Sequence, residues 1–109
     1  MAFSRKTDRL IRAALPEVTA LLDQAFTAVG HAPPAGSALD QAGLLDGAEV
    51  VEDWLAHGYP DLALEHLIYM VHEPGLRISP RTYELIATAG KRMKMDPAKW
   101  ERINPSRQD

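Results

Sequence analysis

The sequence contains no cysteine, so it has no disulfide bonds, no thiolate nucleophile and no thiolate metal site. It also lacks any apolar run approaching the roughly 20 residues that a membrane-spanning helix needs. Charged residues such as Asp8, Arg9 and Arg12 interrupt the amino-terminal segment, and we therefore expect no signal peptide. No strand-like alternation of apolar and polar residues extends over any length. We accordingly expect an all-α protein in the cytoplasm.

Motifs typical of catalysis are also missing. The seven glycines are scattered as helix ends and turns, and neither a phosphate-binding loop nor a nucleophile elbow occurs. His66 and His72 lie six residues apart, so they do not share a helix face, and no HExxH motif is present. A catalytic triad is a spatial arrangement that a sequence leaves open, but nothing here indicates one. We therefore expect that the protein is not an enzyme and that it has no metal site and no cofactor.

Lysine and arginine are absent from residues 40–76, although the whole chain has a net charge of only −3. Residues 1–39 have a net charge of +1 and residues 77–109 of +4, so the middle is strongly acidic. The same stretch is the most apolar part of the sequence, which predicts a helix pair with a buried inner side and a negative outer face. Its eight carboxylates are Asp40, Asp46, Glu49, Glu52, Asp53, Asp61, Glu65 and Glu73.

Helical spacing of apolar residues recurs along the chain and predicts a single domain, residues 1–109, built as a compact bundle of about five or six helices. Pro16 indicates either a kinked first helix or two helices. The loop is expected at 31–37, and frayed ends at 1–6 and 104–109. The expected helices cover about 10–29, 38–45 (a short turn), 47–57, 61–73, 80–93 and 97–103.

The two central helices each have an apolar and a polar side. Their buried residues are expected to be Val50, Val51, Trp54, Leu55, Leu64, Leu67, Ile68 and Val71. In the first helix, over about 10–29, the buried apolar stripe is expected to include Val29. Trp54 and Trp100 are interpreted as core residues in preference to ligand-stacking residues. The opposite faces hold Glu49, Glu52 and Asp53 on one helix and Glu65, Tyr69, His72 and Glu73 on the other.

Helix starts are indicated by small polar residues followed by proline. Ser79-Pro80 and Asp96-Pro97 each place a capping residue before a proline at the first helical position. Ser37 with Asp40 resembles a capping box. Gly90 lies inside a predicted helix, which it weakens by roughly 1 kcal/mol relative to alanine, so we expect another helix to approach closely there.

Three motifs follow one another in a characteristic order: HGYPDLALEHL at 57–67, Ile78-Ser79-x-x-x-Tyr83-Glu84, and Asp96-Pro97-x-x-Trp100. In this order they resemble the MafI-type immunity proteins of bacterial polymorphic toxin systems, over about residues 45–103. The resemblance implies a non-catalytic bacterial cytoplasmic protein that binds and blocks a cognate toxin, often a nuclease.

The charge pattern leads independently to the same expectation. A nuclease site holds a polyanion and is usually basic, so an acidic helix face would complement it. The candidate contacts are Glu49, Glu52, Asp53, Glu65, Tyr69, His72 and Glu73. For the carboxylates the alternative is a helix face that only contacts solvent. For Tyr69 the alternative is packing on a neighbouring helix, and for His72 it is exposure without a partner.

A different class of function also fits the sequence. A self-associating helical adaptor or scaffold would pair its acidic middle with the basic 77–107 region of a second copy, giving a homodimer, or would bind another basic protein. The basic run at 91–94 is interpreted as a favourable helix C-terminus, and the pI of about 5.8 argues against direct nucleic-acid binding.

Overall fold

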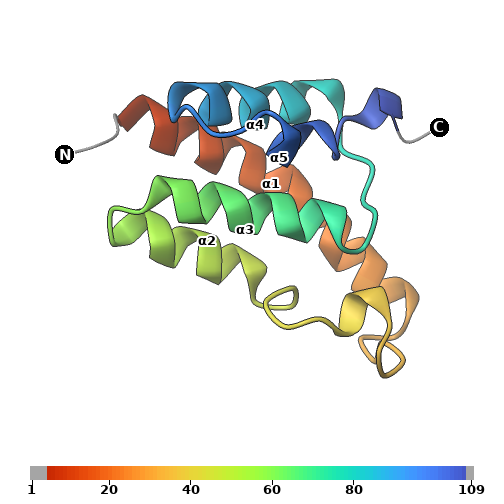
Figure 1. Ribbon diagram of the computed structural model, residues 1–109. Coiled ribbons are helices and arrows are strands. Elements are labelled where there is room, and N and C mark those ends of the chain that lie inside the picture. The colour runs from red at the N-terminus through yellow and green to blue at the C-terminus, as the bar shows by residue number, and fades with distance from the viewer. Residues whose placement is uncertain (1–4, 108–109) are drawn as a thin grey trace.

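The computed structural model describes residues 5–107, and every regular element in that range is helical. This confirms the all-α bundle (Figure 1). The residues 1–4 and 108–109 of the expected frayed ends lie outside the described range. The elements are α1 (Arg5–Ala28), η1 (Ala38–Asp40), α2 (Gly47–Ala56), α3 (Pro60–His72), α4 (Pro80–Arg92), α5 (Ala98–Glu101) and η2 (Pro105–Arg107), where η denotes a 3-10 turn.

The first helix continues through Pro16, which settles the choice between one helix and two. Proline removes one backbone hydrogen bond and disfavours a helix interior by about 3 kcal/mol. The side chain of Pro16 is exposed, and apolar residues are buried on both sides of it, including Ile11, Leu15, Val18 and Leu22. Burial of this stripe therefore holds the helix together across the proline. The stripe ends earlier than expected, because Val29 is 37% exposed.

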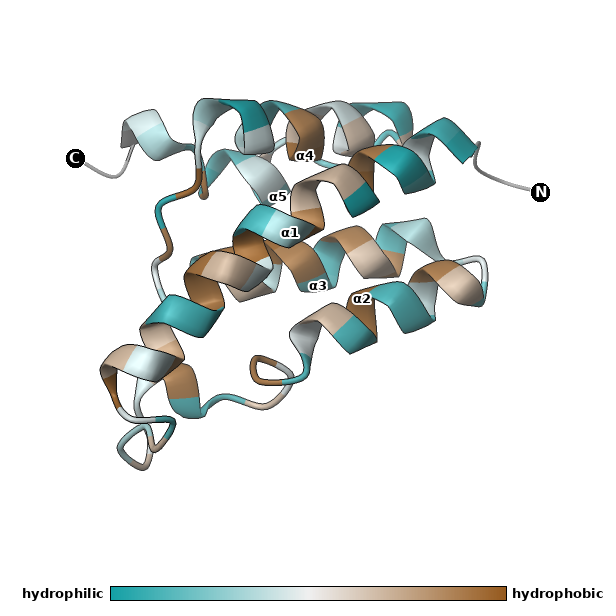
Figure 2. Ribbon diagram, turned by 180° about the vertical axis from the view of Figure 1, so that it is seen from behind, coloured by the Kyte–Doolittle hydropathy of each residue, from teal (hydrophilic) through white to brown (hydrophobic). Residues whose placement is uncertain are grey.

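Helix α1 is the element that joins the bundle together. It packs against α4, α3 and α2, while α2 and α3 form a hairpin and α5 contacts α3 and α4. In Figure 1 α1 passes diagonally behind α3, and the view from behind in Figure 2 places it in front. The smallest dimension of the molecule is 20 Å, about two helix diameters. The bundle is therefore two helices thick.

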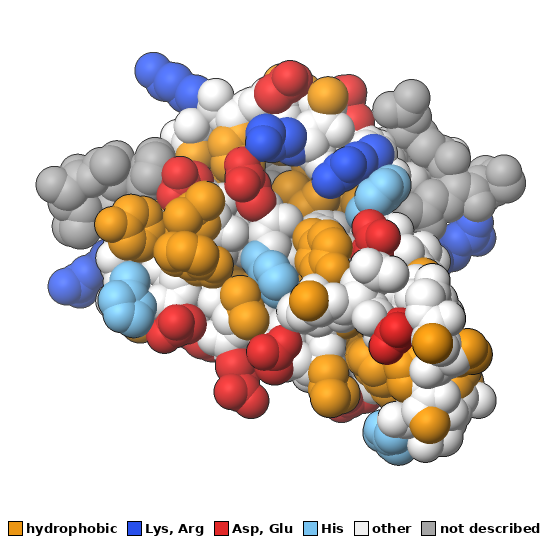
Figure 3. All heavy atoms as spheres, turned by 60° about the horizontal axis from the view of Figure 1, so that its bottom comes forward, with side chains coloured by type: hydrophobic (Ala, Val, Ile, Leu, Met, Phe, Trp, Pro, Cys, Tyr) orange, Lys and Arg blue, Asp and Glu red, His pale blue; other side chains and the backbone are white. Residues whose placement is uncertain are grey.

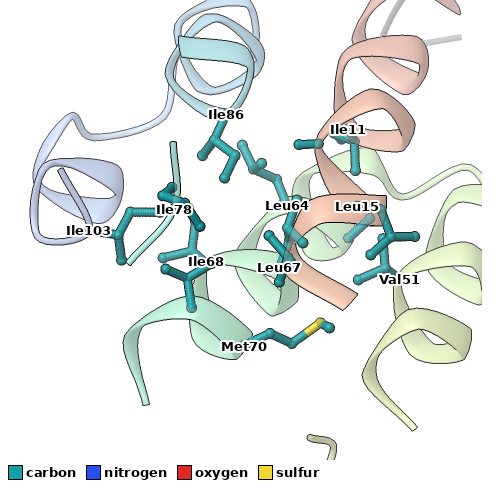
Figure 4. Close-up of a cluster of buried hydrophobic side chains, with 14 of the residues drawn as sticks. Ile11, Leu15, Val51, Leu64, Leu67, Ile68, Met70, Ile78, Ile86 and Ile103 are labelled. Carbon is teal, nitrogen blue, oxygen red and sulfur yellow. The ribbon is translucent and has the colours of Figure 1, made fainter. Parts of the chain in front are cut away.

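The core is formed by side chains from every layer of this arrangement (Figure 4). Helices α1 and α3 contribute six buried hydrophobic residues each, and Leu64, Leu67, Ile68 and Val71 of α3 are buried as expected. Trp100 of α5 is also buried, as the sequence indicated, and it lies directly on Gly90 of α4. The close approach predicted from Gly90 is thus confirmed, with the indole ring of Trp100 as the approaching group.

The helix starts show which capping signals were correct. Ser79 caps α4 as expected, its hydroxyl accepting a hydrogen bond from the backbone N–H of Thr82 at 3.2 Å. Asp96 accepts from the N–H of Ala98 at 3.0 Å, but Pro97, predicted as the first helical residue, is the N-cap. Helix α5 begins at Ala98 and is shorter than predicted. The capping box at Ser37 is wrong: its buried hydroxyl has no partner among the described residues, and Asp40 instead accepts from the N–H of Gly36.

The chain ends are also more ordered than the sequence indicated. Arg5 and Lys6, expected to fray, lie in the first turn of α1. Beyond α5, Ile103 is fully buried, and the side-chain oxygen of Asn104 accepts hydrogen bonds from the N–H and hydroxyl of Ser106. Burial of Ile103 fixes the start of this segment on the core, which explains the short η2 turn that follows.

A carboxylate links α1 to the start of α4. Glu17 accepts hydrogen bonds from the N–H of Ser79 at 2.7 Å and from its hydroxyl at 2.8 Å. Burial raises the pKa of Glu17, but the hydrogen bonds from Ser79 and Thr82 outweigh this effect, so its pKa lies below the usual 4.5. Glu17 therefore acts as a second cap for α4, supplied by a residue 62 positions away.

We expect Gly90→Ala to destabilise the fold by about 1–3 kcal/mol, because the new methyl group would overlap the rigid, buried ring of Trp100. Gly47→Ala is the matched control. Its methyl group would meet the flexible end of Met70, with Cε at 2.6 Å, so the neighbour can move and the loss should be smaller. Urea denaturation followed by circular dichroism measures both. Equal losses would contradict the contact at Trp100.

Glu17→Gln should lower stability at neutral pH by about 1 kcal/mol, because two charge-assisted hydrogen bonds lose their ionised acceptor. The lowered pKa means that the contribution of Glu17 is fully present above pH 4.5 and is lost as pH falls further. The variant should therefore lose less stability than the wild type on acidification below pH 4.5. Parallel acid-denaturation curves for the two proteins would contradict this role.

Candidate functional site

The hairpin of α2 and α3 carries all seven predicted contact residues, but it does not present them on one surface. On α2, Glu49 and Asp53 are exposed and stand one turn apart. Together with Asp46 and the half-buried Val50 they line a shallow open hollow along the outer side of the helix. Figure 3 shows acidic side chains along the lower edge of this face, with hydrophobic and histidine side chains beside them. We call Asp46, Glu49, Val50 and Asp53 the α2 stripe.

Two of the predicted carboxylates are paired with bases from outside the acidic stretch. Arg12 of α1 donates to Glu52 at 3.0 Å, and Lys99 of α5 donates to Glu65 at 2.8 Å. Both pairs are about half exposed, so each contributes little to stability. They nevertheless neutralise charge locally. Tertiary structure thus supplies bases that residues 40–76 lack, and it leaves the α2 stripe as the more negative part of the hairpin.

The carboxylates of the α2 stripe have no such compensation. Within residues 5–107, neither Asp46 nor Glu49 has a Lys or Arg partner. The carboxylate of Asp53 lies 3.6 Å from the ring of His57, whose Nδ1 also donates to the backbone carbonyl of Asp53 at 2.8 Å. The stripe therefore presents three exposed carboxylates along roughly 10 Å of helix.

The outer side of α3 is partly covered by the segment that precedes α2. The hydroxyl of Tyr69 donates to the carbonyl of Ala42 at 2.7 Å, and Nε2 of His66 lies 2.9 Å from the carbonyl of Gly43. A carbonyl oxygen only accepts, so Nε2 of His66 must carry a hydrogen. The two rings are tilted against each other at 5.4 Å. We call this arrangement the 42–43 clasp.

The clasp explains features that the sequence did not reveal. Gly43 has a φ of +82°, and a Cβ there would come within 2.7 Å of the His66 ring. Glycine is therefore required both for the backbone conformation and for the space beside His66. Tyr69 is half-buried and holds a loop, where the sequence offered a choice between a partner contact and packing on a helix. Burial, followed by the negative charge of Glu73, raises the pKa of Tyr69, so it stays a neutral donor near neutral pH.

His72 and Glu73 are exposed at the carboxyl end of α3. Their side chains make no contact that would fix them within the described part of the chain, apart from the charge effect of Glu73 on Tyr69. They stay predicted contacts. The α2 stripe lies on the neighbouring helix, from the start of α2 onward. The loop of the 42–43 clasp also lies beside α3.

The prediction that Trp54 is a core residue is wrong. The sequence placed it on the buried side of α2, but 37% of its surface is exposed, and Val50 is only half-buried. Helix α2 has ten residues and packs mainly on α3, so Val51 and Leu55 fill the contact and a third bulky residue is left outside it. The indole ring makes an edge-to-face contact with Tyr59, with ring centroids 5.8 Å apart. Tyr59 itself is 51% exposed.

In the described range, no three His, Asp or Glu side chains gather as a metal site would require. None of the helices there has the length and apolar character needed to cross a membrane. What the hairpin offers is a rigid anionic stripe with exposed aromatic rings at one end.

Neither a family model, nor a curated protein, nor a solved structure matches the chain.

We expect Tyr69→Phe to lower stability by about 1 kcal/mol, because it removes the hydrogen bond to Ala42 and releases one half of the clasp. Tyr59→Phe is the matched control, since the hydroxyl of Tyr59 has no hydrogen-bond partner within residues 5–107. Hydrogen exchange should show faster exchange in residues 41–46 for Tyr69→Phe only. Unchanged exchange there would contradict the clasp.

Proposed function

We propose that this protein is an immunity protein, which binds a cognate bacterial toxin of the nuclease type through the acidic face of the α2–α3 hairpin and blocks it. The observation that carries the proposal is the α2 stripe. Three carboxylates lie exposed, one at the N-cap of α2 and two on the helix itself, and none has a Lys or Arg partner in the described range.

The physical argument is charge complementarity. A nuclease must hold a polyanion, so its substrate cleft carries lysine and arginine. Carboxylates one turn apart on a helix, as Glu49 and Asp53 are, form a fixed negative array that can occupy the place of phosphates. Such complementarity speeds association and selects the partner more than it adds raw affinity. A segment without bases is what this mode of recognition needs.

The resemblance to MafI-type immunity proteins supports the same function, and the structure gives its motifs a physical role. Ile78 and Trp100 are buried, Ser79 caps α4, and Pro60 begins α3. The motif residues thus maintain the fold, whereas the carboxylates of the α2 stripe lie outside the three motifs. Proteins sharing these motifs would have a common scaffold and would select different toxins through their exposed helix faces.

A self-associating scaffold is the second candidate, favoured by the basic character of residues 77–107. The Lys99–Glu65 pair shows that this region already meets the acidic hairpin within one chain. If the same attraction operated between copies, dimerisation would strengthen at low salt. Sedimentation equilibrium at two salt concentrations distinguishes this candidate from a monomer that binds a separate partner.

The test of the immunity function uses the protein encoded immediately upstream, with calorimetry and a toxin activity assay. We expect tight 1:1 binding and inhibition by the wild type. Glu49→Lys/Asp53→Lys should raise the Kd on the order of 100-fold, because it places two positive charges against a basic cleft. Circular dichroism should show an intact fold, since both residues are exposed.

Glu84→Lys/Glu101→Lys is the matched control, with the same charge change on exposed residues of α4 and α5. It should leave the Kd within a few-fold of the wild type. Tight binding that is indifferent to both variants would retain the immunity function and move the contact surface away from the α2 stripe. The absence of any binding would favour the scaffold.

A further inference from the structure

We propose that Trp54 and Tyr59 form the anchor of the partner interface, and that the partner places an arginine side chain against this aromatic pair. The inference rests on the proposed function and specifies where the partner is held and by what chemistry. Its starting point is the exposure of two large rings at the carboxyl end of the α2 stripe, where the sequence predicted a buried tryptophan.

The aromatic pair is preformed. The planes of the two rings are 86° apart and their centroids are separated by 5.8 Å, an edge-to-face contact. Such a contact uses the edge of one ring and one face of the other, so three ring faces are not engaged by it. The rings also lack freedom to collapse into the core, because Val51 and Leu55 already fill the contact of α2 with the bundle. A partner therefore meets the rings with little ordering cost.

The exposed apolar surface continues along the hairpin. Leu45, just before α2, is 79% exposed, and Val50 lies half-buried between it and Trp54. From residue 46 to residue 54 the helix rises about 12 Å. Apolar side chains therefore mark both ends of the acidic stripe, which is the mixture of anchors and charges found in protein interfaces. A purely solvated face would not need them.

The surrounding charge selects a cation as the group that meets the rings. Asp53 directly precedes Trp54 in the sequence, and Glu49 lies one helical turn before Asp53. A guanidinium group stacks flat on an aromatic face and donates a planar fork of hydrogen bonds to a carboxylate at the same time. A lysine ammonium lacks the planar stack and is more strongly hydrated. Tryptophan is the best aromatic partner for a cation, and Trp, Tyr and Arg dominate interface hot spots.

The acidic hairpin performs two separate tasks in binding. The carboxylates of the α2 stripe attract the partner over distance and set its orientation, so their loss slows association and changes the salt dependence. The aromatic pair acts only after contact, when water is excluded, so its loss accelerates dissociation. Glu52 and Glu65, each paired with a base in its own chain, contribute less to either task.

The experiment measures binding of the protein encoded immediately upstream to wild type, Trp54→Phe and Trp54→Ala. We expect Trp54→Ala to raise the Kd about 30-fold, mainly through faster dissociation. Trp54→Phe, which keeps a ring of lower affinity for cations, should lie between. Val29→Ala, which alters another apolar residue with 37% exposure, should leave the Kd unchanged. Thermal unfolding of each variant confirms that the fold is intact.

A second measurement tests the ring chemistry without the natural partner. Hexa-arginine and hexa-lysine peptides are titrated while the indole N–H resonances of both tryptophans are followed by NMR. Trp54 should shift with hexa-arginine at a several-fold lower concentration than with hexa-lysine. The buried Trp100 should not move.

The outcomes separate the two proposals. If the upstream protein binds tightly but Trp54→Ala changes its Kd less than twofold, the aromatic anchor is overturned and the immunity function stands. If that protein does not bind, the immunity function falls, and the peptides decide the ring chemistry alone. Equal shifts with both peptides, or no shift at Trp54, would overturn the preference for arginine.

Discussion

The structure depends on the burial of α3. Seven of its thirteen residues are buried, as many as in the much longer α1, so other elements must cover this side of the helix. Helices α1, α2, α4 and α5 all pack against it. Because α3 is largely enclosed, only a narrow strip of it reaches solvent, and the 42–43 clasp covers part of that strip. The exposed acidic surface of the hairpin is consequently supplied mainly by α2.

The same enclosure explains how a chain with segregated charge becomes partly balanced. Helices that pack on the hairpin bring Arg12 and Lys99 to Glu52 and Glu65, at the two borders where α1 and α5 approach. Such exposed pairs add little stability, but they reduce the negative field at those borders. The outer side of α2 has no covering helix in the described chain, so no Lys or Arg is brought to the carboxylates of the α2 stripe there.

Under the proposed function, most of the scaffold and most of the recognition surface consist of different residues. The features that resemble immunity proteins, such as the Ser79 cap and the Trp100 packing on Gly90, hold the helices in place. The carboxylates of the α2 stripe and Trp54 lie outside the three motifs, whereas Tyr59 of the proposed aromatic pair lies within the first of them. An arrangement of this kind would allow partner choice to change while the fold is retained.

The sequence by itself determined the helices, their approximate limits and the cap at Ser79, because these depend on local spacing and on neighbouring residues. It also indicated the close approach at Gly90, since a helix rarely keeps a glycine without a packing reason. Only the tertiary structure decided that Trp54 is exposed, that Tyr69 holds a loop, and that Glu17 caps a distant helix. Each of these depends on which elements meet in space, and residues 62 positions apart in sequence leave no local signal of their contact.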